Sequence, residues 1–195
     1  MATVTGAGSL WSNAFDLYVG INGSGSQLLA SNGGTVQAAN GYLGSFAGSL
    51  NNRLTVDGGA LLVTNPFGPA VLDIRRGTNV LNAGQITADN LLLTNNTGVL
   101  ELNGGTLVTL TAKLGNGLTT TVGSGVVWNN SNGLLVDSGT ALTLAGNGSL
   151  NAGIVSNLGT FTYSGGTFGG GGGGGVPTIL VRIHLPRITG EVRSG

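Results

Sequence analysis

The sequence predicts an all-β chain folded as a parallel β-solenoid, which is a stack of short coils rather than a globule around one pocket. Tight glycine turns precede short runs of Leu, Val or Thr along most of the chain, and this is the pattern of an imperfect repeat. Helical periodicity is nearly missing, because Gly or Asn interrupts each stretch of about ten residues. The recurring segments are residues 33–36 (GGTV), 58–63 (GGALLV), 104–108 (GGTLV) and 165–168 (GGTF).

Short β-strands are predicted from one end of the repeat region to the other. Several of them alternate strictly between apolar and polar residues, so that one side chain points inward and the next points outward. Residues 100–103 (LELN) and 142–145 (LTLA) show this alternation. In chain order, the predicted strands are residues 26–29, 53–56, 70–74, 90–94, 98–102 and 140–144.

Turns are predicted where Asn-Gly, Asp-Gly, Gly-Ser and Asn-Asn pairs separate the strands, because Gly and Asn accept left-handed backbone angles. Asn-Gly pairs also suit two-residue hairpins, which leaves an antiparallel arrangement open. The irregular spacing of the strands favours instead coils of two or three strands in a parallel stack. In such a stack, Asn side chains at equivalent turns can bond from one coil to the next.

The composition argues against several function classes. Glycine supplies 39 of the 195 residues and charged residues only 7%, against about 25% in ordinary domains. The 40% apolar content argues against disorder. The seven basic residues are scattered, so no nucleic-acid partner is expected. No apolar run of about 18 residues is present, so membrane insertion is not expected. The absence of cysteine removes thiol chemistry and disulfides.

The chain divides into three parts. Residues 1–168 form the predicted solenoid, and residues 169–175 are an unbroken glycine run that predicts a flexible linker. Residues 176–195 share no features with the repeats, since they hold two of the four prolines, the single histidine and three of the seven basic residues. Three origins stay open for this tail: a native docking strand, a non-native addition, or the out-of-frame product of the glycine tract.

Two phrases near the N-terminus resemble a known repeat family. Residues 8–20 (GSLWSNAFDLYVG) and 23–36 (GSGSQLLASNGGTV) are similar to the β-strand repeats of bacterial autotransporter passengers and PEP-CTERM-associated surface proteins, and residues 54–107 continue the likeness. The resemblance implies a right-handed parallel β-helix in a large exported protein, and it implies no active site. The N-terminus has neither a charged n-region nor an apolar h-region, so the chain is interpreted as a piece of a longer exported protein or as one whose leader has been removed.

No catalytic, cofactor-binding or metal-binding residue is predicted. The single imidazole, His184, lies in the tail, apart from the serines of the repeats. Gly-Gly pairs are followed by Thr or Ala instead of the Asp pattern of calcium-binding repeats. The carboxylates are isolated in sequence, and stacking of coils is the one way to pair them for polysaccharide cleavage. They are Asp16, Asp57, Asp73, Asp89, Glu101 and Asp137.

The one dense charge cluster of the repeat region, formed by Asp73, Arg75 and Arg76, is the candidate surface or ligand contact. Its expected role is a solvated edge or an ion pair between coils, with ligand binding as the alternative. The aromatic residues are scattered, so core packing is favoured over a row that stacks on sugar rings. Thr-x-Thr segments are judged too unevenly placed for an ice-binding array. The aromatic residues include Trp11, Tyr18, Tyr42, Phe67, Trp128 and Tyr163.

The resulting hypothesis is a non-catalytic structural segment, a stalk or fibre subunit that is secreted by a bacterium or displayed on its surface. Coils that template one another leave unpaired strands at both ends, so self-association through the solenoid ends is expected, or else capping of the ends by flanking segments. One alternative is an adhesin or carbohydrate-binding module whose partners are surface glycans. The other is a polysaccharide-cleaving β-helix enzyme. No cofactor is expected in the favoured case.

Overall fold

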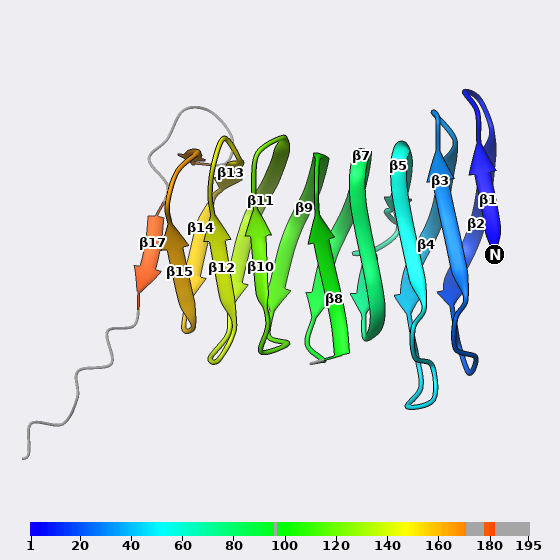
Figure 1. Ribbon diagram of the computed structural model, residues 1–195, viewed down its shortest axis with the longest axis horizontal. Coiled ribbons are helices and arrows are strands. Elements are labelled where there is room, and N and C mark those ends of the chain that lie inside the picture. The colour runs from blue at the N-terminus through cyan, green and yellow to red at the C-terminus, as the bar shows by residue number, and fades with distance from the viewer. Residues whose placement is uncertain (96, 171–177, 182–195) are drawn as a thin grey trace, which may run out of the picture.

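The computed structural model describes residues 1–95, 97–170 and 178–181. These residues form strands and turns without any helix, and the strands stack into about eight coils (Figure 1). Every strand pairing among these residues is parallel. The predicted parallel solenoid is therefore confirmed, and the hairpin alternative is wrong for the described residues.

Each coil crosses three faces, here named A, B and C. Face A consists of β1 (Ala2–Thr5), β3 (Gln27–Ser31), the start of β5 (Arg53–Val63), the start of β7 (Arg76–Leu93), β8 (Thr97–Leu102), β10 (Thr119–Val122), β12 (Ala141–Leu144) and β15 (Thr160–Tyr163). Face B consists of the first parts of β2 (Leu10–Val19), β4 (Thr35–Leu43), β9 (Gly105–Leu114) and β11 (Val126–Val136), the end of β5, the middle of β7, β13 (Ser149–Ala152) and β16 (Thr167–Gly169). Face C consists of the second parts of β2, β4, β9 and β11, the end of β7, β6 (Val71–Ile74), β14 (Ile154–Asn157) and β17 (Thr178–Val181).

The coils are numbered by the strands that they contain. Coil 1 holds β1 and β2, coil 2 holds β3 and β4, coil 3 holds β5 and β6, and coil 4 is the single long strand β7. Coil 5 holds β8 and β9, coil 6 holds β10 and β11, coil 7 holds β12 to β14, and coil 8 holds β15 to β17. In Figure 1 the near strands run upward and the far strands run downward as the chain advances from blue to orange. The stack is therefore right-handed, as parallel crossovers normally are.

The core is a set of apolar ladders that run through the stack, one or two from each face. On face B the inner position is apolar in all eight coils and is at most 1% exposed from coil 2 to coil 7. Alternation explains this arrangement, because every second residue of a strand points to the same side. The ladder consists of Trp11, Val36, Leu61, Ile86, Leu107, Trp128, Leu150 and Phe168.

Glycines in the left-handed region turn the chain from face A to face B in every coil. Gly84 has a φ angle of 88° and Gly105 has a φ angle of 82°. Residues other than glycine rarely adopt these values. A Cβ atom at Gly84 would also overlap the carbonyl oxygen of Gly59 in the preceding coil. The Gly-Gly pairs of the sequence are therefore this corner, where neighbouring backbones approach too closely for side chains.

The coils come in two lengths. Along face B, Trp11, Val36, Leu61 and Ile86 follow one another at equal intervals of the sequence. After Ile86 the interval becomes shorter, and the next two ladder residues are Leu107 and Trp128. The longer coils contain long corner segments, residues 20–26 and 44–52 between faces C and A, and residues 64–70 between faces B and C.

Little of the predicted linker and tail falls within the described residues. Gly169 ends β16, and β17 lies inside the predicted tail. β17 pairs in parallel with β14 and so extends face C by one strand. Residues 171–177 and 182–195, which include His184, lie outside the described part of the chain.

Candidate binding surfaces

An aromatic and ionic cluster lies on the outer side of face C in coils 1 to 3. The rings of Tyr18 and Tyr42 stack with their centroids 5.1 Å apart and 17° between their planes. The guanidinium carbon of Arg75 lies 5.1 Å from the centroid of the Tyr42 ring, in cation–π geometry. The Nε atom of Arg75 also donates to Oδ2 of Asp73 at 2.7 Å. Two of the three predicted contact residues, Asp73 and Arg75, therefore meet in this cluster.

The third predicted contact residue, Arg76, points elsewhere. Its Nη1 atom donates to the carbonyl oxygen of Ser45 at 3.3 Å, so it ties coil 4 to the 44–52 segment that follows coil 2. The ion pair itself lies within one coil, and the contact between coils is made by Arg75 on Tyr42. The alternation of a strand accounts for this division, because side chains two residues apart share a face whereas the next residue points to the other side.

Asp16 of coil 1 also belongs to this cluster. The Tyr18 hydroxyl donates to Oδ2 of Asp16 at 3.0 Å, and the amide of Asn40 donates to Oδ1 at 2.9 Å. The hydrogen bond to this carboxylate raises the pKa of the Tyr18 phenol above its ordinary value. The cluster is thus largely paired: each carboxylate faces a donor through at least one oxygen, and the Tyr42 ring contacts both Tyr18 and Arg75, whereas Oδ1 of Asp73 is buried without a hydrogen-bond partner.

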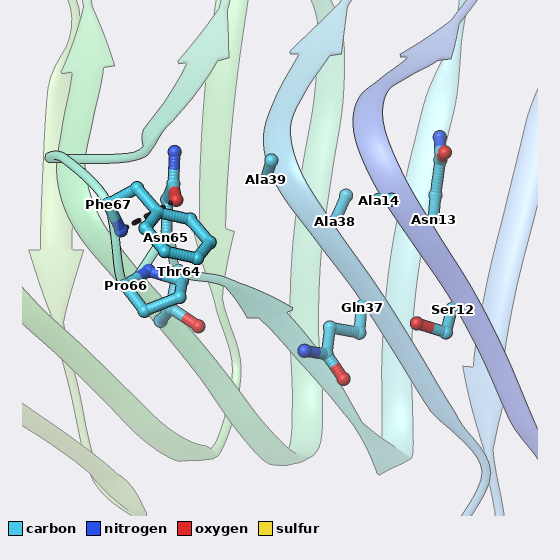
Figure 2. A pocket seen from close by; sticks show the side chains of 10 residues that line it. All are labelled: Ser12, Asn13, Ala14, Gln37, Ala38, Ala39, Thr64, Asn65, Pro66 and Phe67. Carbon is cyan, nitrogen blue, oxygen red and sulfur yellow. Dashed lines mark hydrogen bonds between the residues drawn. The ribbon is translucent and has the colours of Figure 1, made fainter.

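A groove of about 220 Å³ lies at the corner between faces B and C, across coils 1 to 3 (Figure 2). Gln37, Ala38 and Ala39 of coil 2 lie at its floor, and Ser12, Asn13 and Ala14 of coil 1 stand along one side. The opposite side is the 64–70 segment, here called the corner loop, which presents Asn65, Pro66 and Phe67. None of the lining residues carries an ionisable group.

The corner loop is held in place at both ends by one carboxylate of the next coil. Oδ2 of Asp89 accepts hydrogen bonds from the backbone N–H of Asn65 at 3.3 Å and of Ala70 at 2.9 Å. Within the loop, the backbone N–H of Phe67 donates to Oδ1 of Asn65 at 3.0 Å, which is an Asx turn. Prolines at 66 and 69 restrict the backbone further. The backbone that carries Phe67 is therefore held in place, and the residue itself is 97% exposed.

The same turn occurs two coils earlier at the same corner. The backbone N–H of Phe15 donates to Oδ1 of Asn13 at 3.3 Å, and the Phe15 ring is 79% exposed. Asx turns also occur at Asn95 and Asn116, but those turns present Thr97 and Leu118 at other corners. Two Asn-x-Phe segments thus place exposed rings on either side of the alanine floor of coil 2.

The prediction that the aromatic residues pack in the core is wrong for most of them. Of the six that the sequence singled out, only Trp128 is fully buried, where its Nε1 atom donates to Thr109 at 3.0 Å. Trp11, Tyr18, Phe67 and Tyr163 are each at least 40% exposed. Leu, Val and Ile fill the narrow interior, which leaves the larger rings on the outer side, at the corners and at the ends.

The threonines align better than their sequence spacing suggests. Thr121, Thr143 and Thr162 stand in register on the outer side of face A, beside the row of Thr119, Ala141 and Thr160. This array covers only the last three coils, because coils 3 and 5 place Arg53 and Glu101 on the same face, 3.6 Å apart as an ion pair. The stacking therefore produces a short hydroxyl patch rather than a complete threonine face.

Of the two remaining carboxylates, Asp137 makes structural contacts and Asp57 is exposed. Asp137 accepts a hydrogen bond from the Ser138 N–H at 2.8 Å and lies 3.4 Å from Nζ of Lys113, and both contacts lower its pKa. Asp57 is exposed at a corner. Across residues 1–95, 97–170 and 178–181, no three His, Cys, Asp or Glu side chains gather into a metal-binding group.

These residues also contain no helix that could cross a membrane. The chain was compared with protein-family models, with curated proteins and with solved structures. No family model, curated protein or solved structure matches it.

Proposed function

We propose that this chain is a non-catalytic structural segment of an exported bacterial surface protein, a stalk or fibre subunit whose solenoid ends associate. The observation that carries the proposal is the exposure of Trp11. Its side chain occupies the inner ladder of face B, yet it is 40% exposed whereas Val36 and Leu61 in the next two coils are 1% and 0% exposed. A further coil laid on coil 1 would bury Trp11 as the others are buried.

The backbone at this end is open as well. Among the described residues, β1 pairs only with β3 and β2 pairs only with β4, so each presents an unpaired edge. Large exposed apolar side chains stand beside these edges, and they include Met1, Leu10, Trp11 and Phe15. Unpaired edges with apolar neighbours are the usual template for adding another strand.

The far end of the stack offers the complementary edge. In the part of the chain that the structure describes, β15 pairs only with β12 and β16 pairs only with β13. The rings of Phe161 and Phe168, 5.4 Å apart, fill the last interior positions on these two faces. Contact between the two different ends is heterologous, so it repeats without closing and gives filaments.

The outer surface supports a structural role over a catalytic one. Amide ladders bond neighbouring coils on the outside: the Asn103 amide donates to Asn82 at 2.9 Å, and the Asn151 amide donates to Asn129 at 2.8 Å. Five of the six carboxylates of the repeat region are engaged in hydrogen bonds or ion pairs, those of Asp16, Asp73, Asp89, Glu101 and Asp137. Export to the cell surface is supported by the sparse charge and by the repeat pattern of the sequence.

Sedimentation velocity over a range of concentrations, with negative-stain imaging of the same samples, tests the association. The expected result is single rods at low concentration and longer rods of unchanged width at high concentration. The variant Trp11→Lys places a charge in the contact and is expected to leave only single rods. Asn132→Lys, an exposed residue of coil 6, is the matched control and is expected to associate like the wild type.

Rods that stay single at every concentration would overturn the end-to-end association, and equal association of the Trp11→Lys variant would place the contact elsewhere. Labelling of intact source cells with an antibody against the chain tests the location independently. Signal only after the cells are permeabilised would contradict export.

A further inference from the structure

The corner loop is built more elaborately than a stack of coils requires. Coils 1, 2 and 4 pass the same corner with one or two residues between their strand positions on faces B and C, whereas coil 3 uses residues 64–70. This longer passage is fixed by Asp89, by the Asn65 turn and by two prolines. This ordered loop presents the ring of Phe67, which is 97% exposed and buries almost no surface in the fold. An ordered loop that presents an exposed aromatic side chain is typical of a binding site.

The groove beside this ring selects a ligand class by its chemistry. Its lining carries no charge, so a phosphate, a carboxylate or a basic peptide would lose hydration without gaining a counter-charge. A purely apolar ligand would cover the Gln37 amide and the Nδ2 group of Asn65 without giving them hydrogen-bond partners, whereas the Asn13 amide is already bonded to Asp16 and Phe15. A neutral sugar satisfies both conditions, because its hydroxyl groups pair with amides and its C–H face lies against the aromatic ring.

We infer that the B–C corner groove is a binding site for an uncharged glycan, a function beyond the structural role proposed above. Phe67 stacks on one sugar ring, and the amides of Gln37 and Asn65 bond to its hydroxyl groups. The short side chain of Ala39 keeps the floor low enough for the sugar to reach these groups. The volume of about 220 Å³ is smaller than pockets for drug-sized ligands, which start at about 300 Å³, and suits a chain that lies across the corner.

Phe15 extends the site along the axis of the solenoid. It stands on the same corner two coils before Phe67, which is about 10 Å away at the spacing of adjacent strands. A second stacking ring at that separation lets two residues of one glycan chain bind together. The site therefore prefers an oligosaccharide over a monosaccharide.

The test is a titration of the purified chain with neutral hexasaccharides of glucose and of N-acetylglucosamine, followed by calorimetry and by saturation-transfer NMR. At least one of these probes is expected to bind, more tightly than its monosaccharide. Phe67→Ala is expected to weaken that binding at least tenfold, whereas Phe67→Trp keeps it. Phe15→Ala is expected to lower the affinity for the hexasaccharide while leaving the weak binding of the monosaccharide unchanged.

Phe46→Ala is the matched control, because Phe46 is also an exposed ring, at 56%, but lies at the corner between faces C and A. The Phe46→Ala variant is expected to bind the hexasaccharide as tightly as the wild type does. Since Phe67 contributes its backbone and not its ring to the loop, thermal unfolding of Phe67→Ala should match that of the wild type.

Three results would overturn the inference. The first is the absence of binding to any neutral hexasaccharide, and the second is binding that Phe67→Ala leaves unchanged. The third is a preference for a polyanionic glycan such as heparin. Loss of rod association in Phe67→Ala, with no sugar binding in the wild type, would instead assign the groove to contacts between copies of the chain.

Discussion

Coils 1 to 4 and coils 5 to 8 share one interior but differ on their surfaces. The inner ladder of face B runs through both halves, with Leu61 and Leu107 each fully buried. The coils of the first half are longer than those that open the second half, as the intervals between ladder residues show. Much of the additional length lies at corners, in segments such as residues 44–52 and 64–70.

The difference teaches where such a protein can vary. The strands are fixed by pairing on both sides and by the ladders within, so a change in length is absorbed where the chain turns. In the first half these turns carry Phe15, Phe46 and Phe67 on the outside, and face C adds the cluster of Tyr18 and Tyr42. In the second half most turns are short and present Gly, Asn and Ser. The interior maintains the fold, and the corners carry the candidate binding surfaces.

We expect the largest effect on stability from substitution of a corner glycine, and the loss of stability should be the same in both halves. Gly84→Ala and Gly105→Ala each force a side chain into a left-handed backbone and against the preceding coil. Each should lower the free energy of unfolding by about 3 kcal/mol or more. Gly133→Ala, where a Cβ meets nothing within 4 Å, should change it by less than about 1 kcal/mol. Urea unfolding measures all three, and a mild Gly105→Ala would show that the corner differs between the halves.

Removal of the loop anchor should affect only the first half. Asp89→Ala deletes the acceptor of two backbone hydrogen bonds at the ends of the corner loop, at a cost of about 2 kcal/mol. Hydrogen exchange of amides in residues 64–70 should accelerate while the coils of the second half keep their protection. Asp57→Ala, an exposed carboxylate of the coil that carries the loop, is the control. Unchanged exchange in the loop would mean that the prolines alone hold it.

Replacement of a buried asparagine should have an effect of the opposite sign, because in the first half it should stabilise the protein. Asn79 of coil 4 is 0% exposed, and neither of its amide atoms has a hydrogen-bond partner. It stands in register between Leu54 and Leu100, so Asn79→Leu should raise the free energy of unfolding by about 1–2 kcal/mol. Asn130 of coil 6 donates to Thr109 at 2.9 Å and only its Oδ1 atom lacks a partner, so Asn130→Leu should stabilise the protein less than Asn79→Leu. Equal effects in chemical denaturation would contradict the difference.

The smallest expected effect is a pH dependence in the second half. The Ser138 N–H and Lys113 hold the pKa of Asp137 below its ordinary value, so the contact stabilises the fold above the unfolded-state pKa of about 3.9 and is lost as pH falls through the lower folded-state pKa. Asp137→Asn should therefore reduce the stability difference between pH 6 and pH 3. Urea midpoints of the wild type and the variant at several pH values give the comparison, and parallel curves would exclude a contribution of this carboxylate.

Much of the fold could be predicted because the repeated signals are local. Gly58 and Gly59 mark a corner, and the alternation at residues 100–103 marks a strand, without any knowledge of distant parts. The predicted strands at 53–56 and 98–102 lie within β5 and β8. The lengths of β5, β7 and β11 were not predicted, because these strands continue around corners where the sequence shows only a turn signal.

The candidate site was harder to predict because it depends on which coils become neighbours. The charge cluster was found from the sequence, but the partner of Arg75, Tyr42, lies far from it along the chain, in the preceding coil. The repeated Asn-x-Phe at residues 13–15 and 65–67 was the available signal for the groove. The two segments can be recognised as parts of one site only when the stacking of coils 1 to 3 places both of them on one corner.

The direction of the main-chain hydrogen bonds has a mechanical consequence. They run along the axis of the stack, so tension between the two ends pulls on the bonds of one interface between coils rather than on the whole molecule at once. Coils would then unfold one at a time, beginning at an end of the stack. Each release adds the contour of one coil, which is about 85 Å for a long coil of the first half and about 70 Å for a shorter one of the second. A fibre made of such units can lengthen under load in steps while its remaining coils stay folded.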